Sequence, residues 1–331
     1  MTRLRVGCVG TGFIAGRHLA ALASFPDVDV VAVADAVPDR ADAAAARFGA
    51  RGYHDGVALL ESEELDAVWL CVPPFAHGPL EQAAVDRSLP FFVEKPLAHD
   101  LATAVGIAES VRARGLPTAV GYHWRHLGVV REAERVLAGS PAQLLLGYWL
   151  DATPAAPWWS DRARSGGQVL EQTTHIFDLA RVLVGEVDVV HSAEAGARAG
   201  APGRDVPVAA TTVLRFSSGA VGSISCTRLL GRRHRVGVQL LADGIAVELG
   251  ERSLTDHDLR VAGGDGERVV TSGQDPVADE DREFLDVLRG LVPRARVPYA
   301  EAVRTHALAW AADRSARDGE PVCMPLGGND D

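Results

Sequence analysis

Short apolar runs alternate with segments of helical periodicity through the first third of the chain. Strands that alternate with helices in this way predict a parallel sheet whose two faces are covered by helices. The fold class expected for this part is therefore α/β, with a doubly wound sheet. The strand-like runs are Leu4–Val9, Val28–Ala34, Ala67–Val72, Phe91–Val93 and Thr118–Gly121.

The pattern changes after Trp124. From Val187 to Val261, strand-like runs follow one another through glycine turns with no helix between them, which predicts antiparallel neighbours. We therefore expect a second domain of the α+β class, with a large, mostly antiparallel open sheet. The predicted helices are Gly128–Ala138, Gly167–Val184, Asp279–Leu291 and Ala300–Ser315.

Length, charge and cysteine spacing limit the number of domains, the classes of partner and the location to be expected. A single core rarely grows beyond about 250 residues, so a chain of 331 residues predicts two domains, 1–123 and 124–331. The net charge of −11 disfavours nucleic acid and anionic membrane surfaces as partners, and we see no signal peptide or membrane span. The cysteines form no CxxC pair, so reduced thiols and a cytoplasmic location are expected; they are Cys8, Cys71, Cys226 and Cys323.

A GxGxxA sequence follows the first predicted strand directly and opens a helix. Gly10 permits a tight turn, Gly12 lets the backbone approach a pyrophosphate, and Ala15 lets the helix pack close to the strand. The free N–H groups at the helix N-terminus favour an anion. This context predicts a dinucleotide-binding Rossmann domain, with cofactor contacts from Gly10, Thr11, Gly12, Phe13 and Ile14.

Asp35 ends the second predicted strand, 25 residues after Gly10. A carboxylate at this place accepts hydrogen bonds from the adenosine ribose and repels a 2′-phosphate. The next residues, Ala36 and Val37, are not basic, so NAD(H) is favoured over NADP(H). The alternative is that Asp35 only caps the helix that begins near Pro38.

Lys95 is the only lysine in the chain, and the other 32 of the 33 basic residues are arginines. It follows the strand-like run Phe91–Val93, at the end of the sheet where ligands of open α/β folds bind. A partly buried lysine can exchange a proton near neutrality, whereas arginine cannot. The alternative is that Lys95 only forms an ion pair with Glu94 at the end of the strand.

Three polar residues of the predicted helix Gly167–Val184 share one face. Glu171, His175 and Asp178 lie within about 60° of one another at 100° per residue. A histidine beside two carboxylates is suited to general-base chemistry. The alternative is an ordinary solvated helix face.

Several motifs in this order resemble those of the Gfo/Idh/MocA family, named for glucose–fructose oxidoreductase, inositol dehydrogenase and a rhizopine-catabolism protein. The resemblance extends over nearly the whole chain, and the EKP and HxxDL motifs are its most specific parts. The matching segments are residues 6–22, the CVPP of Cys71–Pro74 with His77 after it, the EKP of Glu94–Pro96, and the GG…HxxDL of residues 166–179.

The resemblance implies an NAD-binding Rossmann domain at 1–123 and a substrate-binding and oligomerisation domain at 124–331. It also implies a sugar or polyol substrate between them and a homodimer or homotetramer formed through the open sheet. Lys95 matches the lysine beside the nicotinamide and the substrate hydroxyl, and Glu171 and His175 match an aspartate–histidine pair, with glutamate here replacing aspartate. Further cofactor contacts are expected from Cys71, Pro73, His77 and Glu94.

Four more residues are candidates for substrate contact. His123 and Arg125 lie at the place of the family's GxNxR-like segment, where they either touch substrate or pack the hinge. Trp158 and Trp159 have the surface to stack on a sugar ring, but adjacent tryptophans cannot both face one pocket, so one is expected in the core.

The implied reaction moves a hydride from a carbinol carbon to nicotinamide C4. His175 accepts the hydroxyl proton, Lys95 hydrogen-bonds the oxygen, and Glu171 binds a neighbouring hydroxyl or orients His175. One alternative keeps NAD as a relay in a glycoside hydrolase or epimerase-like enzyme. Another is a non-catalytic sensor, which the retention of all three residues disfavours.

A basic cluster is the one local argument for an anionic partner. It either contacts a phosphorylated or nucleotide-linked substrate or, as is more common on a strand, forms salt bridges at a subunit contact. Its members are Arg228, Arg232, Arg233, His234 and Arg235. No metal site is expected, since only Glu171 and His175 have ligand spacing.

Overall fold

The computed structural model describes residues 3–196, 205–264 and 266–325. The chain divides into two compact units. The first unit is Met1–His123 with Pro276–Val303, and the second unit is Trp124–Asp275 with Arg304–Asp331. The division after His123 lies where the sequence places it, but residues 276–303 return to the first unit, so the range 124–331 is wrong for the second domain.

A six-stranded parallel sheet forms the centre of the first unit, in the order β3-β2-β1-β4-β5-β6. The doubly wound α/β prediction is confirmed. The sequence missed β3, which has three residues and no apolar alternation. The strands are β1 Leu4–Val9, β2 Val28–Ala34, β3 Arg51–Tyr53, β4 Ala67–Leu70, β5 Phe91–Val93 and β6 Thr118–Val120.

Helices cover both faces of this sheet. Apolar residues of α1 and α10 share one cluster with β1 and β4, whereas residues of α3, α4 and α5 share the cluster on the opposite face. The helix α10 therefore belongs to the first unit because its Phe284 and Leu285 fill that core. The helices are α1 Phe13–Ser24, α2 Pro38–Phe48, α3 Gly56–Ser62, α4 Pro79–Asp86, α5 Leu101–Arg114 and α10 Pro276–Leu288, with the short η1 at Pro74–Ala76.

In the described residues, the second unit contains a nine-stranded sheet in the order β14-β13-β12-β11-β7-β10-β9-β8-β15. β7 and β10 are parallel and the other neighbours antiparallel, which confirms the mostly antiparallel prediction. The strands are β7 Leu144–Ala152, β8 Val187–Ala195, β9 Ala209–Phe216, β10 Val221–Leu230, β11 Arg235–Ala242, β12 Ile245–Ser253, β13 Asp256–Gly263, β14 Gly266–Ser272 and β15 Val322–Cys323.

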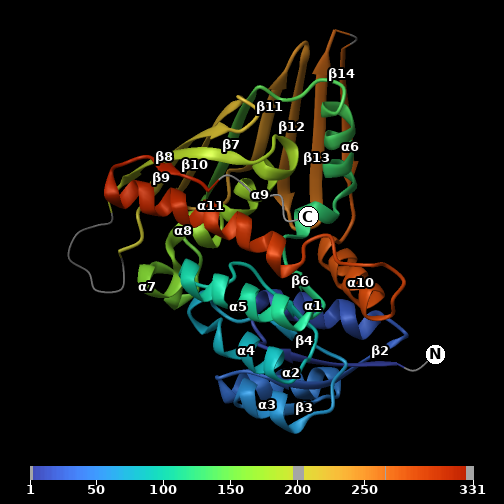
Figure 1. The fold of residues 1–331 in the computed structure, drawn as a ribbon. Helices are drawn as coiled ribbons and strands as arrows, with labels where there is room; N and C mark the ends of the chain where they lie inside the picture. The colour runs from blue at the N-terminus through green and yellow to red at the C-terminus, as the bar shows by residue number, and fades with distance from the viewer. Residues whose placement is uncertain (1–2, 197–204, 265, 326–331) are drawn as a thin grey trace. The chain divides into compact units, whose positions relative to one another are not determined.

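One face of this sheet packs against α6, α9 and α11, whose apolar residues join a single core cluster with the strands (Figure 1). No helix of the described residues is long and apolar enough to cross a membrane. The helices are α6 Gly128–Leu137, α7 Arg162–Ser165, α8 Gly167–Glu171, α9 Thr174–Leu183 and α11 Tyr299–Asp318, with η2 at His123–His126 and η3 at Pro157–Ser160.

The single helix predicted over Gly167–Val184 is wrong, because the chain breaks between α8 and α9. Both the N–H and the hydroxyl of Thr173 donate to the carbonyl of Gln168, at 3.0 and 3.1 Å, which interrupts the regular helical bonding. The expected polar face is also not solvated, since Asp178 is 1% exposed.

Candidate functional site

The two glycines of the loop before α1 differ in whether the surrounding protein leaves room for a side chain. Gly10 has φ +91°, and a Cβ there would lie 2.2 Å from the carbonyl oxygen of Cys71. Gly12 begins α1 and has no atom within 4 Å of a Cβ position. The protein backbone therefore requires Gly10, whereas the space beside Gly12 is open, as a pyrophosphate-binding loop needs. Of the expected contacts beside them, Phe13 is 78% exposed and Ile14 is half-buried.

Asp35 connects this loop to the end of β2. The N–H and the hydroxyl of Thr11 donate to Asp35 Oδ2 at 2.9 and 2.8 Å, and the N–H of Val37 donates to Oδ1 at 2.9 Å. Val37 is itself the N-cap of α2, which has no side-chain cap. The Asp35 carboxylate thus orders the glycine loop and keeps acceptor capacity at Oδ1 for another donor.

The CVPP segment follows β4 at the same edge of the sheet. The N–H of Cys71 donates to the carbonyl of Val9 at 2.8 Å, and Pro73 is half-buried before η1. His77 is 3% exposed, and its Nδ1 pairs with Glu81 at the start of α4. One ring nitrogen of His77 therefore serves to anchor α4, and Nε2 has no hydrogen-bond partner among the residues that the structure describes.

Glu94 and Lys95 follow the end of β5 and differ in how deeply they are buried. Glu94 is 4% exposed and Lys95 is half-buried. Glu94 Oε1 lies 3.0 Å from His18 Nε2, and Oε2 accepts the backbone N–H of Lys95 at 3.0 Å. A Cβ on Gly121 would lie 2.7–2.9 Å from the Glu94 carboxyl group, so that position requires glycine. Although burial raises the pKa of Glu94, the hydrogen bond and charge of His18 lower it below its ordinary value.

Three buried residues near Glu94 were not predicted from the sequence: His18, Glu280 and Asp281. His18 lies on the buried face of α1 with Ala15 and Leu22. A titratable residue is unusual on such a face, and this is the one feature of the sequence that could have indicated its role. Nothing in the sequence around Glu280 and Asp281 predicts that they lie beside His18. Within the described residues, His18, Glu94 and Glu280 form a group with metal-ligand spacing, their atoms lying within 4.8 Å of one another. Both His18 nitrogens already lie on carboxylates, so we assign the group to hydrogen bonding.

In the second unit, His175 lies in the first turn of α9 and is 4% exposed. Its ring stacks on the Trp149 indole of β7 with centroids 5.8 Å apart and an interplanar angle of 19°. A Cβ on Gly147 would lie 2.6 Å from the Ile176 side chain. The glycine therefore lets α9 approach β7, and the indole then orients the imidazole. Trp149 is a neighbour that the sequence analysis did not find.

Glu171 ends α8 and is held by one of the two adjacent tryptophans. The Trp159 Nε1–H donates to Glu171 Oε2 at 2.6 Å. Trp159 is 1% exposed and Trp158 is half-buried. Trp159 is thus the core residue of the pair, and it sets the orientation of the carboxylate.

Arg125 makes a structural ion pair. Its Nε and Nη2 lie 2.7 and 2.6 Å from the two carboxylate oxygens of Asp178, and the Thr305 hydroxyl donates to Oδ1 at 2.8 Å. This bidentate pair joins η2 to α9 within the second unit. His123, in the first unit, is 5% exposed.

Two of the four arginines of the basic cluster form ion pairs within the chain. Arg233 pairs with Asp151 at 3.0 Å and with Glu251, and its guanidinium lies 5.6 Å from the Trp149 ring centroid. The remaining members divide between pairing and exposure: Arg235 pairs with Glu248, Arg228 donates to the carbonyls of Val206 and Pro207, and Arg232 and His234 are exposed.

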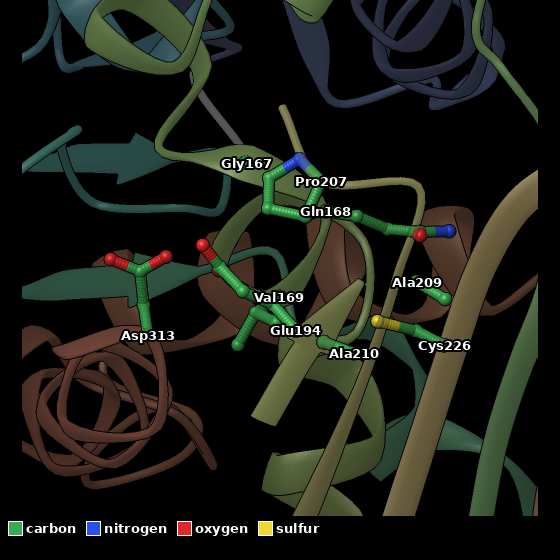
Figure 2. Close-up of a pocket in the computed structure, with 9 residues that line it drawn as sticks. All are labelled: Gly167, Gln168, Val169, Glu194, Pro207, Ala209, Ala210, Cys226 and Asp313. Carbon is green, nitrogen blue, oxygen red and sulfur yellow. The ribbon is translucent and has the colours of Figure 1, made fainter. Parts of the chain in front are cut away.

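A pocket in the second unit lies beside α8 (Figure 2). Asp313 and Glu194 lie on one side of it and Gln168 and Cys226 on the other, and Arg162 pairs with both carboxylates. Its volume is about 10 Å³, room for about one water molecule. A sugar therefore does not fit this pocket. All four cysteines are free thiols; Cys8, Cys71 and Cys226 are buried and Cys323 is exposed.

Two family models match this chain. The model of an oxidoreductase family with an NAD-binding Rossmann fold matches residues 4–122, and the model of the GFO/IDH/MocA C-terminal domain matches residues 142–247. The D-apiose dehydrogenase of Paraburkholderia graminis is 27% identical over 97% of this chain and 89% of its own length.

Two other relatives extend the comparison. The myo-inositol 2-dehydrogenase of Thermotoga maritima is 31% identical over 68% of this chain and 69% of its own length. A levoglucosan dehydrogenase solved with NADH and levoglucosan shares the fold, with a TM-score of 0.87, 22% identity and coverage of 98% of this chain and 100% of that chain. The chain belongs to the Gfo/Idh/MocA oxidoreductase family.

Proposed function

We propose that this chain is an NAD-dependent dehydrogenase that transfers a hydride between nicotinamide and a secondary hydroxyl or ketone of a sugar, inositol or related polyol. One observation carries the proposal. The only lysine of the chain follows β5, at the same edge of the sheet where β1 and β2 present the open glycine loop and Asp35. The named activities of the relatives, on apiose, inositol and levoglucosan, support a polyhydroxylated substrate.

The first unit fits a dinucleotide at the open space beside Gly12. Asp35 would hold the adenosine ribose through Oδ1, which accepts one hydrogen bond, from the Val37 N–H, among the described residues. This carboxylate would also repel a 2′-phosphate, so NAD is preferred to NADP. NAD supplies the hydride acceptor when it is bound. The residues that would hold it are Gly10, Thr11, Gly12, Phe13, Ile14, Asp35, Cys71, Pro73, His77, Glu94 and Lys95.

Three side chains would do the work on the substrate. His175 accepts the hydroxyl proton, Lys95 donates a hydrogen bond to the oxygen as it becomes a carbonyl, and Glu171 binds a neighbouring hydroxyl. Such base catalysis contributes about 10²–10⁴-fold to the rate. His123 and Trp158 would contact the sugar, whereas Arg125 acts through Asp178, with which it is already paired.

The open face of the nine-stranded sheet supports assembly into a homodimer or homotetramer. Outward-facing Val213 of β9 is 55% exposed and Val221 of β10 is 48% exposed. Leu144 and Leu146 of β7 are half-buried on the same face. Exposed apolar side chains on an open sheet face are typical of a protein–protein contact.

The test is NADH appearance at 340 nm with a panel of inositols, pentoses, hexoses and anhydrosugars, with NADP in parallel. We expect turnover with NAD on at least one polyol. Lys95→Ala and His175→Ala should each lower kcat by at least 10²-fold while the Kd for NAD stays within threefold. The exposed His191→Ala in the second unit is the matched control and should keep full activity.

Two outcomes would contradict the proposal. Tight NAD binding with no NADH from any substrate would favour a relay or a sensor, and hydrolysis of a nitrophenyl glycoside without net NADH would identify the relay. Loss of NAD binding in both variants would mean that their roles are misassigned.

A further inference from the structure

Four buried titratable side chains meet behind the Lys95 segment of the first unit. His18 comes from α1, Glu94 from the end of β5, and Glu280 and Asp281 from α10. Their exposed fractions are 0%, 4%, 2% and 0%. None of the reaction steps proposed above uses His18, Glu280 or Asp281, although burying ionisable groups without pairing them is costly.

His18 bridges two carboxylates of this cluster. Its Nδ1 lies 2.8 Å from Asp281 Oδ1, which also accepts the Trp69 indole N–H at 2.7 Å. Its Nε2 lies 3.0 Å from Glu94 Oε1. An imidazole donates from both nitrogens only as an imidazolium. Burial lowers the pKa of His18, but the charge and hydrogen bonds of Asp281 and Glu94 raise it well above its ordinary value.

Glu280, unlike His18, is shifted toward its uncharged form, because burial raises its pKa. Both of its carboxyl oxygens are buried without a hydrogen-bond partner in the described residues, and burial raises its pKa well above the ordinary value. A protonated Glu280 adds no charge to the cluster. The imidazolium then lies between the Glu94 and Asp281 carboxyl groups, with Lys95 beside Glu94 as a second cation.

The cluster reaches Lys95 through Glu94. Glu94 Oε2 accepts the Lys95 backbone N–H at 3.0 Å, while the other oxygen is held by His18. Gly121 packs against the same carboxyl group, so close that a Cβ would lie 2.7 Å from Oε1. The Glu94 carboxylate is therefore held by the His18 imidazolium, the Lys95 N–H and the close approach of Gly121. It has little freedom to rotate.

We propose that His18 is a positioning residue for Lys95, acting through Glu94 as an internal counter-ion that keeps the Glu94 carboxylate in place. The importance of this link for turnover rests on the function proposed above, whereas the link itself rests on contacts within the first unit. The groups that face Glu94 are His18 from α1, Glu280 and Asp281 from α10, Lys95, His123 and Cys71.

Because Lys95 is the only lysine, its side chain can be observed directly. Labelling with ¹³Cε-lysine gives one side-chain resonance, so its environment is measured without any substrate. His18→Leu removes both hydrogen bonds and should shift this resonance. His18→Gln keeps an amide donor toward Glu94 and should shift it less. Glu280→Gln replaces a neutral acid by a neutral amide in the same cluster and serves as the control, with the resonance unchanged.

Kinetics on the NAD-bound enzyme give the second measurement. In His18→Leu we expect kcat to fall at least tenfold, with the Kd for NAD within threefold of wild type. Without the imidazolium, burial raises the pKa of Glu94, so the acid limb of the kcat profile should move to higher pH. His18→Gln should recover part of kcat, and Glu280→Gln should keep wild-type kcat.

Three results would overturn the inference. The first is a Lys95 resonance that does not move in His18→Leu or His18→Gln. The second is a kcat that falls only as far as NAD affinity falls. The third is a stoichiometric divalent metal in the purified wild type that His18→Gln loses. If the wild type turns over no substrate, the proposed function fails, yet the Lys95 resonance still decides whether His18 positions Lys95.

Discussion

In the first unit, the groups assigned to the cofactor come from the ends of β1, β2, β4 and β5, far apart in sequence. In the second unit, the groups assigned to the substrate come from one stretch, residues 158–175, in which His175 stacks on Trp149 of β7. The parallel topology by itself brings the first set to one edge. The second set depends on individual side-chain partners, such as Trp159 for Glu171 and Trp149 for His175. Backbone changes should therefore damage the first site, and losses of single partners the second.

The largest expected effect lies in the second unit, at the ion pair of Arg125 and Asp178. Arg125→Leu leaves the carboxylate of Asp178 buried, so we expect the free energy of unfolding to fall by about 3–5 kcal/mol, measured by urea denaturation. The double variant Arg125→Leu/Asp178→Leu should recover much of this loss. A variant with unchanged stability and a raised KM would instead assign Arg125 to the substrate.

A glycine pair tests the first unit. Gly10→Ala places a Cβ 2.2 Å from the Cys71 carbonyl oxygen at a positive φ, and it should cost about 1–3 kcal/mol of stability. Gly12→Ala meets no protein atom within 4 Å, so the melting temperature should stay constant while NAD affinity falls. Thermal melts and NAD titration measure the two effects. Equal loss of stability in both variants would contradict the distinction between them.

A smaller effect is expected at the indole that holds Glu171. Trp159→Phe keeps the ring in the core but removes the N–H donor, so kcat/KM should fall by about fivefold to tenfold, a loss of about 1 kcal/mol. Trp310→Phe on α11 is the control and should leave kcat/KM unchanged. Wild-type kcat/KM in Trp159→Phe would show that the indole does not orient Glu171.

The smallest effect is a gain in stability that depends on pH. Glu280 has a raised pKa, so the folded chain keeps a proton that the unfolded chain releases above the ordinary glutamate pKa of 4.5. Its contribution to stability therefore declines as pH rises through that range. Glu280→Gln should raise the melting temperature by about 2–4 °C at pH 8 and by little at pH 5. A gain that is equal at both pH values would mean that Glu280 is not held protonated.

Local patterns predicted much of the fold. Apolar runs located five of the six strands of the first sheet, and the glycine loop and Asp35 were placed correctly at the ends of β1 and β2. Periodicity predicts where a backbone is extended or helical and which face is apolar. It did not detect the break at Thr173, where a hydroxyl bonds to the carbonyl of Gln168.

By itself, the sequence determined the class of both units, the order of the motifs and the presence of a single lysine at the end of β5. Only the tertiary structure decided that α10 packs on the first unit, that Arg125 pairs with Asp178, and that His18 meets Asp281, 263 positions away. The physical reason is that periodicity records that a face is buried. It does not record which of two apolar surfaces the face meets, nor which polar side chains then become neighbours.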